Sequence, residues 1–194
     1  TKQVASAAEF GKRSNDLEGT GLVLEGCQIE VRDDDGRVLP AGRDGHIFIK
    51  SPYLLRGYLT AEHNSLLSPL QNGYFDTGDY GYINNNRLFV TARTKDLIIR
   101  GGVNISPRLI EEVLLKHNMV REVAVIGKPH AFWGEEIVAF VVPEDVFLFD
   151  KASIFAYCQA HIAQDAIPST IHIIDELPYA STGKIQKYKL KDLV

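Results

Sequence analysis

The sequence has only two cysteines, Cys27 and Cys158, among its 194 residues. A small secreted domain held by disulfides carries a denser set of cysteines, so the composition favours a reducing, cytoplasmic location. Neither cysteine lies in a Cys-x-x-Cys pair or beside clustered histidines, and the six histidines are dispersed. We therefore assign no metal-ligating residues.

Two further absences narrow the class of protein. No apolar run approaches the ~20 residues that a transmembrane helix needs, and no signal peptide is visible. The formal net charge is -4 and the 21 lysines and arginines are scattered, which argues against binding to nucleic acid or to an anionic membrane. Hydrophobic residues make up 45% and charged residues 24% of the chain, as in ordinary globular proteins.

The first half of the chain is predicted to be rich in β-strands. Residues 28–32 alternate polar and apolar side chains, and a strong turn sequence follows at 33–36. Residues 46–50 are predicted to form another short strand, and residues 80–91 a hairpin around the turn Asn84–Asn86. Short strands with frequent turns indicate a small, barrel-like β subdomain.

The pattern changes after about residue 93, where helices begin to alternate with strands. Ser106 is predicted to cap a helix with Pro107 in its first turn, and Glu111 is expected on the surface of that helix. Asp150 is predicted to cap a second helix that buries Cys158. Apolar runs predict three strands, at residues 123–126, 137–142 and 170–174.

The predicted fold class is therefore α+β, in two parts. Residues 1–94 form a β-rich subdomain, the end of a larger domain, and residues 95–194 form a compact, mobile α+β domain.

Three glycine-containing segments carry candidate functional residues, at 73–79, 93–107 and 181–184. In the first, Asp79 either closes a polar turn or accepts hydrogen bonds from the two hydroxyls of a ribose. In the second, paired glycines either make a turn before a helix or let the backbone approach a ligand closely. The third is not a phosphate-binding loop, because Pro178 and Ile185 occupy two of the required positions. It is either a lysine-rich tail or a loop that presents Lys184 to a phosphate or carboxylate.

The order and spacing of these segments resemble the C-terminal part of the adenylate-forming superfamily, which includes acyl-CoA synthetases, luciferases and peptide-synthetase adenylation domains. The resemblance runs from about Gly19 to Leu193 and is closest to acyl-CoA synthetases. It is carried by the segments Phe75–Asp79, Arg93–Asp96, Gly101–Pro107, Trp133–Glu135 and Leu177–Lys184.

The resemblance implies an AMP-forming acid–CoA ligase that uses ATP, Mg²⁺ and CoA and belongs to fatty acid metabolism. A carboxylate attacks the α-phosphate of ATP to give an acyl-adenylate and pyrophosphate, and a thiol then takes the acyl group and releases AMP. By resemblance, Asp79, Arg93 and Thr77 bind the nucleotide. Lys184 is catalytic, because a compact cation stabilises the charge that develops on carboxylate and phosphate oxygens.

The resemblance also implies a rotation of the C-terminal domain between the two steps. Lys95 occupies the hinge position of the family, where a few backbone angles absorb such a motion. After the rotation, Gly101, Gly102 and Trp133 are expected to contact CoA.

Departures from the family pattern leave alternatives open. The family's phosphate-binding loop and most of its acid pocket precede the matching region, so we expect Thr1 to begin partway into a longer enzyme and the isolated chain to be inactive. Ala166 and Ile167 stand before Pro168, where many relatives have a basic residue that can meet a CoA phosphate. The alternatives are an enzyme that loads a carrier protein and a non-catalytic remnant module.

Overall fold

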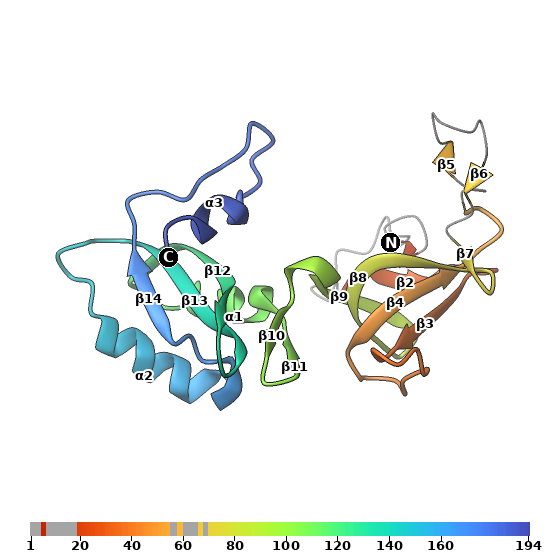
Figure 1. The fold of residues 1–194 in the computed structure, drawn as a ribbon, viewed down its shortest axis with the longest axis horizontal. Helices are drawn as coiled ribbons and strands as arrows, with labels where there is room; N and C mark the ends of the chain where they lie inside the picture. The colour runs from red at the N-terminus through yellow and green to blue at the C-terminus, as the bar shows by residue number, and fades with distance from the viewer. Residues whose placement is uncertain (1–4, 7–18, 55–57, 60–65, 68–69) are drawn as a thin grey trace, which may run out of the picture. The chain divides into compact units, whose positions relative to one another are not determined.

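The computed structural model describes residues 5–6, 19–54, 58–59, 66–67 and 70–194 (Figure 1). The chain divides into two compact units, Thr1–Lys95 and Asp96–Val194. The first is built from strands and the second from strands and helices, so the predicted α+β class is confirmed. The predicted roles of the two parts, as the end of a larger domain and as a mobile domain, stay predictions.

The first unit is an antiparallel sheet with the order β1-β2-β9-β8-β4-β3, in which β7 also pairs with β8. Its strands are β1 (Ala5–Ser6), β2 (Gly21–Val23), β3 (Gln28–Arg32), β4 (Gly45–Lys50), β7 (Leu70–Gln71), β8 (Tyr74–Asn84) and β9 (Arg87–Arg93). A separate pair joins β5 (Tyr58–Leu59) and β6 (Leu66–Leu67). Ile47, Ile49 and Leu88 form the buried core of this unit.

The predicted hairpin in this unit is confirmed. Asn85 and Asn86 connect β8 to β9 with φ angles of 47° and 58°. Positive angles at both central residues are typical of the tight turn whose twist matches the flanking strands, and asparagine adopts them more readily than most residues. The hairpin fixes which residues of β8 and β9 lie opposite each other.

The second unit has a five-stranded sheet with the order β11-β10-β13-β12, and β14 runs parallel to β13. Its strands are β10 (Ile98–Arg100), β11 (Val103–Ile105), β12 (Val120–His130), β13 (Gly134–Pro143) and β14 (Thr170–Ile173). Its α-helices are α1 (Pro107–Leu114), α2 (Lys151–His161) and α3 (Lys187–Lys191). Two 3-10 turns are η1 (Thr94–Asp96), which spans the division between the units, and η2 (Gln164–Ala166).

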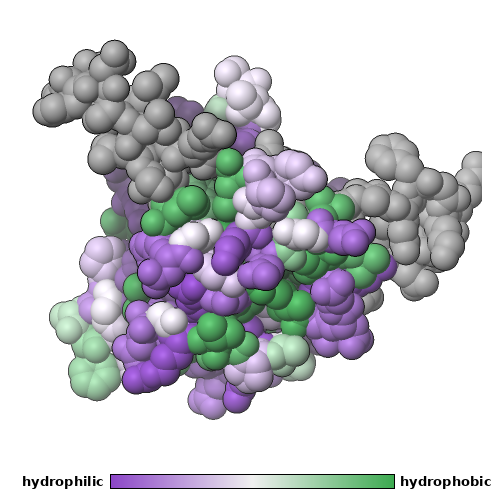
Figure 2. Space-filling model, turned by 90° about the vertical axis from the view of Figure 1, so that its right-hand side faces the viewer, coloured by the Kyte–Doolittle hydropathy of each residue, from purple (hydrophilic) through white to green (hydrophobic). Residues whose placement is uncertain are grey.

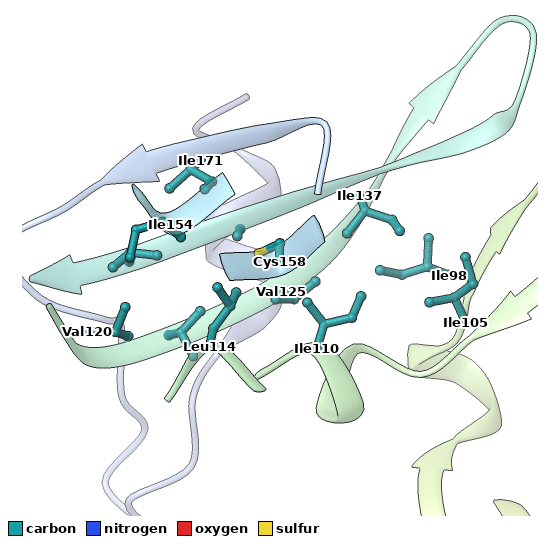
Figure 3. Packing of buried hydrophobic residues seen from close by; sticks show 13 residues of the cluster. Ile98, Ile105, Ile110, Leu114, Val120, Val125, Ile137, Ile154, Cys158 and Ile171 are labelled. Carbon is teal, nitrogen blue, oxygen red and sulfur yellow. The ribbon is translucent and has the colours of Figure 1, made fainter. Parts of the chain in front are cut away.

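Successive side chains of β12 and β13 point to opposite faces of the sheet. Both faces are covered, because each carries its own cluster of buried hydrophobic residues. One face packs against α1 and α2, and Figure 3 shows Val125 beside Cys158 of α2 and Ile137 farther along the sheet toward Ile98. The other face carries Phe140, which belongs to a second buried cluster with Leu190 of α3. The unit therefore has two hydrophobic layers of its own.

The predicted helix starts are confirmed. The carboxylate of Asp150 accepts hydrogen bonds from the backbone amides of Ala152 and Ser153, at 3.0 and 3.2 Å. Ser106 holds the N-cap position of α1 with Pro107 in the first turn, although its side chain makes no capping hydrogen bond. Extended backbone at the cap and a fixed proline φ favour this start without help from the hydroxyl.

The stability of the second unit is expected to fall at high pH because of Cys158. Burial raises the pKa of this thiol from 9.0 to about 11, so the folded state holds the proton more tightly than the unfolded chain. This stabilisation is complete below pH 9.0 and is lost as the pH rises through about 11. We expect a loss of about 2–3 kcal/mol over this window.

Urea unfolding followed across this pH range measures the effect. The matched variant Cys158→Ala is expected to be less stable below pH 9.0, because it leaves a cavity beside Ile154 and Val125. Its free energy of unfolding is expected to change less over the alkaline window. Equal pH dependence of the two proteins would show that the buried thiol is not the cause.

One face of the molecule is mixed in character. Hydrophilic side chains are interspersed with smaller hydrophobic groups on the face shown in Figure 2. Such a mixture is normal, because apolar atoms contribute much of the accessible surface of any folded domain. Among the helices that the structure describes, none is long and apolar enough to cross a membrane.

Candidate functional site

The first group of predicted site residues lies on the β8–β9 hairpin. Asp79 and Arg93 face each other in the strand register, and Arg93 Nη1 lies 3.0 Å from Asp79 Oδ1. The Asp79 side chain is 5% exposed and that of Arg93 is 58% exposed. Because a guanidinium has five donors in a fixed fork, Arg93 can hold the buried carboxylate and still offer N–H groups outward. The structure therefore brings two of the three predicted nucleotide residues into direct contact.

The charge on Asp79 depends on its partner. Burial raises the pKa of the Asp79 carboxyl, and the Arg93 guanidinium acts against this rise. A buried carboxylate whose pKa is raised gains from every additional hydrogen-bond donor. This environment suits a ligand that brings hydroxyl groups to the carboxylate.

A β-bulge determines where Asp79 points. Two successive pairs between β4 and β8 are separated by one residue on β4 and by three residues on β8, among them Asp79. Bulges bend a strand and redirect its side chains, and they recur next to active sites. Gly78, inside the bulge, has a φ angle of 65°, which glycine adopts without strain. Gly81 follows the bulge. A Cβ atom added to Gly81 would lie 1.9 Å from the carbonyl oxygen of Phe89, so only glycine fits at this position.

Thr77 supports the bulge from inside. Its hydroxyl donates to the carbonyl oxygen of Ile47 at 2.9 Å and accepts from the amide of Asp79 at 3.0 Å. A hydroxyl has one proton, so this hydrogen bond leaves Thr77 only acceptor capacity for another partner. The geometry thus gives Thr77 a positioning role toward Asp79, and its predicted contact with a nucleotide stays a prediction.

Lys95 lies in the 3-10 turn η1 and is exposed. It is the last residue of the first unit. Its predicted role as a hinge stays a prediction.

The second group of predicted site residues gathers at the tip of the β10–β11 hairpin. Gly101 and Gly102 form the turn, with φ angles of 58° and 82°. The Gly101 amide donates to the carbonyl oxygen of Trp133 at 2.8 Å, and a Cβ atom on Gly101 would lie 3.3 Å from the indole ring. The Trp133 side chain is partly exposed. The turn interpretation is therefore correct, and the turn also brings bare backbone against an accessible aromatic ring.

Arg100 is a site candidate that the sequence analysis missed. Its guanidinium carbon lies 5.5 Å from the centroid of the Trp133 ring. Its Nη1 donates to the carbonyl oxygens of Asp165 and Ile167, at 2.8 and 3.4 Å. These bonds place a cation beside the segment before Pro168, where the sequence lacks a basic residue. The signal in the sequence was an arginine directly before the paired glycines.

Lys184 lies on a small hairpin and not on an unstructured tail. Tyr179 and Ile185 pair as an isolated antiparallel bridge, and the Ala180 amide donates to the carbonyl oxygen of Lys184 at 2.8 Å. Gly183 turns the chain with a φ angle of 76°. The Lys184 side chain is exposed and has no ion pair or hydrogen bond with any residue that the structure describes. Its ammonium group is thus presented to solvent, as the loop interpretation requires.

The predicted site residues fall into three places. The pair Asp79–Arg93 belongs to the first unit, whereas the Gly101–Trp133 tip and Lys184 belong to the second. Within the described parts of the chain, no three histidine, cysteine or acidic side chains gather closely enough to hold a metal ion.

Residues 109–184 match the family described as the AMP-binding enzyme C-terminal domain. The chain is 39% identical over 181 residues to a 2-succinylbenzoate–CoA ligase of Listeria monocytogenes, and this match covers 92% of the chain and 36% of the ligase. Among solved structures, o-succinylbenzoate CoA synthetase of Bacillus subtilis, in complex with its acyl-adenylate, has a TM-score of 0.78 and 34% identity. That match covers 91% of this chain and 36% of the synthetase. The amide bond synthetase of Marinactinospora thermotolerans has a TM-score of 0.78 and 31% identity, over 90% of this chain and 36% of that protein.

The chain thus spans only about a third of the length of these relatives, and its residues 109–184 match a C-terminal domain. The predicted resemblance to adenylate-forming enzymes is confirmed, and CoA ligases are among the relatives that the chain matches. The acid in the names of these CoA ligases is a succinylbenzoate, which gives no support to the expected link with fatty acid metabolism.

Proposed function

We propose that the chain is the C-terminal part of an AMP-forming acid–CoA ligase, because residues 109–184 match the AMP-binding enzyme C-terminal domain and 92% of the chain matches a CoA ligase. The full enzyme adenylates a carboxylic acid with ATP and transfers the acyl group to CoA. The observation that supports this most is Lys184, an exposed lysine at the turn of a hairpin within the matched domain. The isolated chain is proposed to be inactive, since it covers only 36% of the ligase that it matches.

In the proposed adenylation step, the nucleotide binds through its ribose. The two ribose hydroxyls donate hydrogen bonds to the Asp79 carboxylate, which is buried and favours additional donors. Arg93 is already bonded to Asp79 and donates from its exposed edge. Thr77 holds the bulge that carries Asp79.

Lys184 is proposed to stabilise the charge that develops when the carboxylate attacks the α-phosphate. An ammonium group acts most strongly when it enters a site from which water is excluded. Within the described part of the chain, the Lys184 ammonium makes no bond that would have to break when it withdraws from the reacting oxygens after adenylation. Mg²⁺ accompanies the phosphates of ATP as part of the substrate, and we assign no residue of this chain to it.

In the proposed thioester step, Lys95 serves as the hinge and the Gly101–Gly102 turn approaches CoA. Glycine backbone allows close approach, and the exposed ring of Trp133 offers an apolar surface beside it. Arg100 adds a positive charge beside Trp133 at the same tip, and a guanidinium is well suited to bind a phosphate. Many relatives have a basic residue before the position of Pro168 that can contact a CoA phosphate. Arg100 can supply the same positive charge, and it therefore favours CoA over a carrier protein as the acceptor.

The acid and the acceptor are tested with the full-length protein. With ATP, Mg²⁺ and CoA, we expect one acid of a panel headed by 2-succinylbenzoate to yield an acyl-CoA together with equal amounts of AMP and pyrophosphate. Mass spectrometry of the products identifies the thioester. Acyl transfer to an amine or to a carrier protein, with none to CoA, would favour the other acceptors. Absence of AMP formation with every acid would favour a non-catalytic module. The cytoplasmic location expected from the two cysteines stays a prediction.

A further inference from the structure

The hairpin that carries Lys184 is bonded to a carboxylate at each end. Before the turn, the Tyr179 hydroxyl donates to Glu122 Oε2 at 2.6 Å. After the turn, Lys187 Nζ lies 2.6 Å from Glu111 Oε1. The two carboxylates come from different elements, Glu122 from β12 and Glu111 from α1. The two anchors therefore bracket Lys184 in the sequence.

Glu111 is itself held in place, which makes it a firm anchor. Its Oε1 also accepts the backbone amide of Val125 at 2.8 Å, an N–H group that does not point to β13. The Glu111 and Lys187 side chains are only 17% and 30% exposed. A charge-assisted hydrogen bond is stronger where water is partly excluded, and screening by salt weakens it less there. The expectation that Glu111 is a simple helix-surface residue is therefore wrong.

Apolar packing fixes the segments on either side of the hairpin and reaches its base at Ile185, but it does not reach the tip. Leu177 and Leu190 are 3% and 0% exposed and belong to the buried cluster under β12 and β13. By contrast, residues 181–184 are all exposed. The position of the tip thus depends on how the base is held, by the packing of Ile185 and by the polar bonds at Tyr179 and Lys187.

We propose that Glu111 and Glu122 are positioning residues that clamp the Lys184 hairpin against the sheet. The proposal rests on the proposed function, in which Lys184 must reach the reacting oxygens during adenylation. A hairpin clamped at both ends presents Lys184 from a narrow range of positions, and small misplacements of a catalytic group reduce rate steeply. Glu111 and Glu122 bond to the two ends of the hairpin, so in this proposal both act through Lys184.

The clamp is tested in the full-length enzyme with Glu111→Gln. Glutamine keeps an oxygen that accepts the Val125 amide, so the substitution removes the charge and leaves that backbone bond. Tyr179→Phe removes only the hydroxyl bond to Glu122 and is the second, milder variant. The matched control is Glu112→Gln, because Glu112 is the next residue on α1 and its bond to Arg108 is exposed.

Hydrogen exchange of peptides covering residues 178–186 reads out the hairpin directly. We expect exchange to be about tenfold faster in Glu111→Gln, as the loss of one charge-assisted bond implies, and unchanged in Glu112→Gln. The amides that report are those of Ala180, Gly183 and Gln186, which are bonded within the hairpin. Unchanged exchange in both Glu111→Gln and Tyr179→Phe overturns the clamp.

The two half-reactions then separate positioning from general stability. We expect adenylation to be about tenfold slower in Glu111→Gln, while thioester formation from supplied acyl-adenylate stays unchanged. Lys187→Arg, which keeps the cation, is expected to retain adenylation. If the variants exchange faster but the unaltered protein forms no adenylate with any acid, the clamp is supported and the proposed function is rejected. If the unaltered protein forms adenylate and the variants change neither the hydrogen exchange nor the adenylation rate, the proposed function is supported and the clamp is rejected.

Discussion

Replacing Lys184 by alanine in the full-length enzyme is expected to slow adenylation by about 100- to 1,000-fold, the usual cost of removing a group that stabilises transition-state charge. Thioester formation from supplied acyl-adenylate is expected to be nearly unchanged, because its chemistry takes place after Lys184 has left. The physical basis is that the Lys184 ammonium has no partner among the described residues and is free to meet a developing negative charge. Pyrophosphate release and acyl-CoA formation measure the two steps separately.

The matched control for this variant is Lys189→Ala. Lys189 is exposed, lies on α3 and shares the lysine-rich surroundings of Lys184. It is expected to leave both half-reactions unchanged. Equal loss of both half-reactions in Lys184→Ala would contradict the role of this lysine in adenylation.

Replacing Asp79 by asparagine is expected to weaken ATP binding by about 10- to 100-fold, the range for losing hydrogen bonds to a charged group. The asparagine keeps the shape of the side chain but offers one acceptor oxygen in place of two. Burial raises the pKa of the Asp79 carboxyl, so the fold itself is expected to tolerate a neutral group there. Calorimetric titration of the full-length protein with ATP measures the affinity, and thermal unfolding monitors the fold.

The control is the same substitution three residues earlier, Asp76→Asn. Asp76 is exposed, and its Oδ1 accepts the Gly78 amide at 2.9 Å, which an asparagine oxygen can also do. It is expected to bind ATP normally. If Asp79→Asn also binds ATP with unchanged affinity, Asp79 is a turn residue, the simpler alternative that the sequence left open.

Much of the fold follows from local patterns in the sequence. The strand at 28–32, the hairpin turn at Asn85 and the cap at Asp150 were predicted because each depends on neighbours within a few residues. Alternation, turn propensity and capping are local effects of backbone and side-chain geometry. The alternation of buried faces in β12 and β13 is also local, since it has a period of two.

The parts of the site that the sequence did not predict depend on distant partners. The bulge that directs Asp79 exists only in the register between β4 and β8. Arg100 bonds to a carbonyl 65 residues later, and Glu111 to an ammonium 76 residues later. No periodicity relates such positions, so a basic residue before a turn and an acidic residue on a short helix look like ordinary surface residues. Thr77 was assigned to the nucleotide by resemblance, and only the structure shows that its proton is already used.

The central claim, that this chain completes an acid-activating adenylation site, is tested most directly by ATP–pyrophosphate exchange in the full-length protein. The account predicts exchange that requires a carboxylic acid, does not require CoA, and is lost in Lys184→Ala. Exchange that is absent with every acid of the panel, or that is as fast in Lys184→Ala as in the unaltered protein, would contradict it.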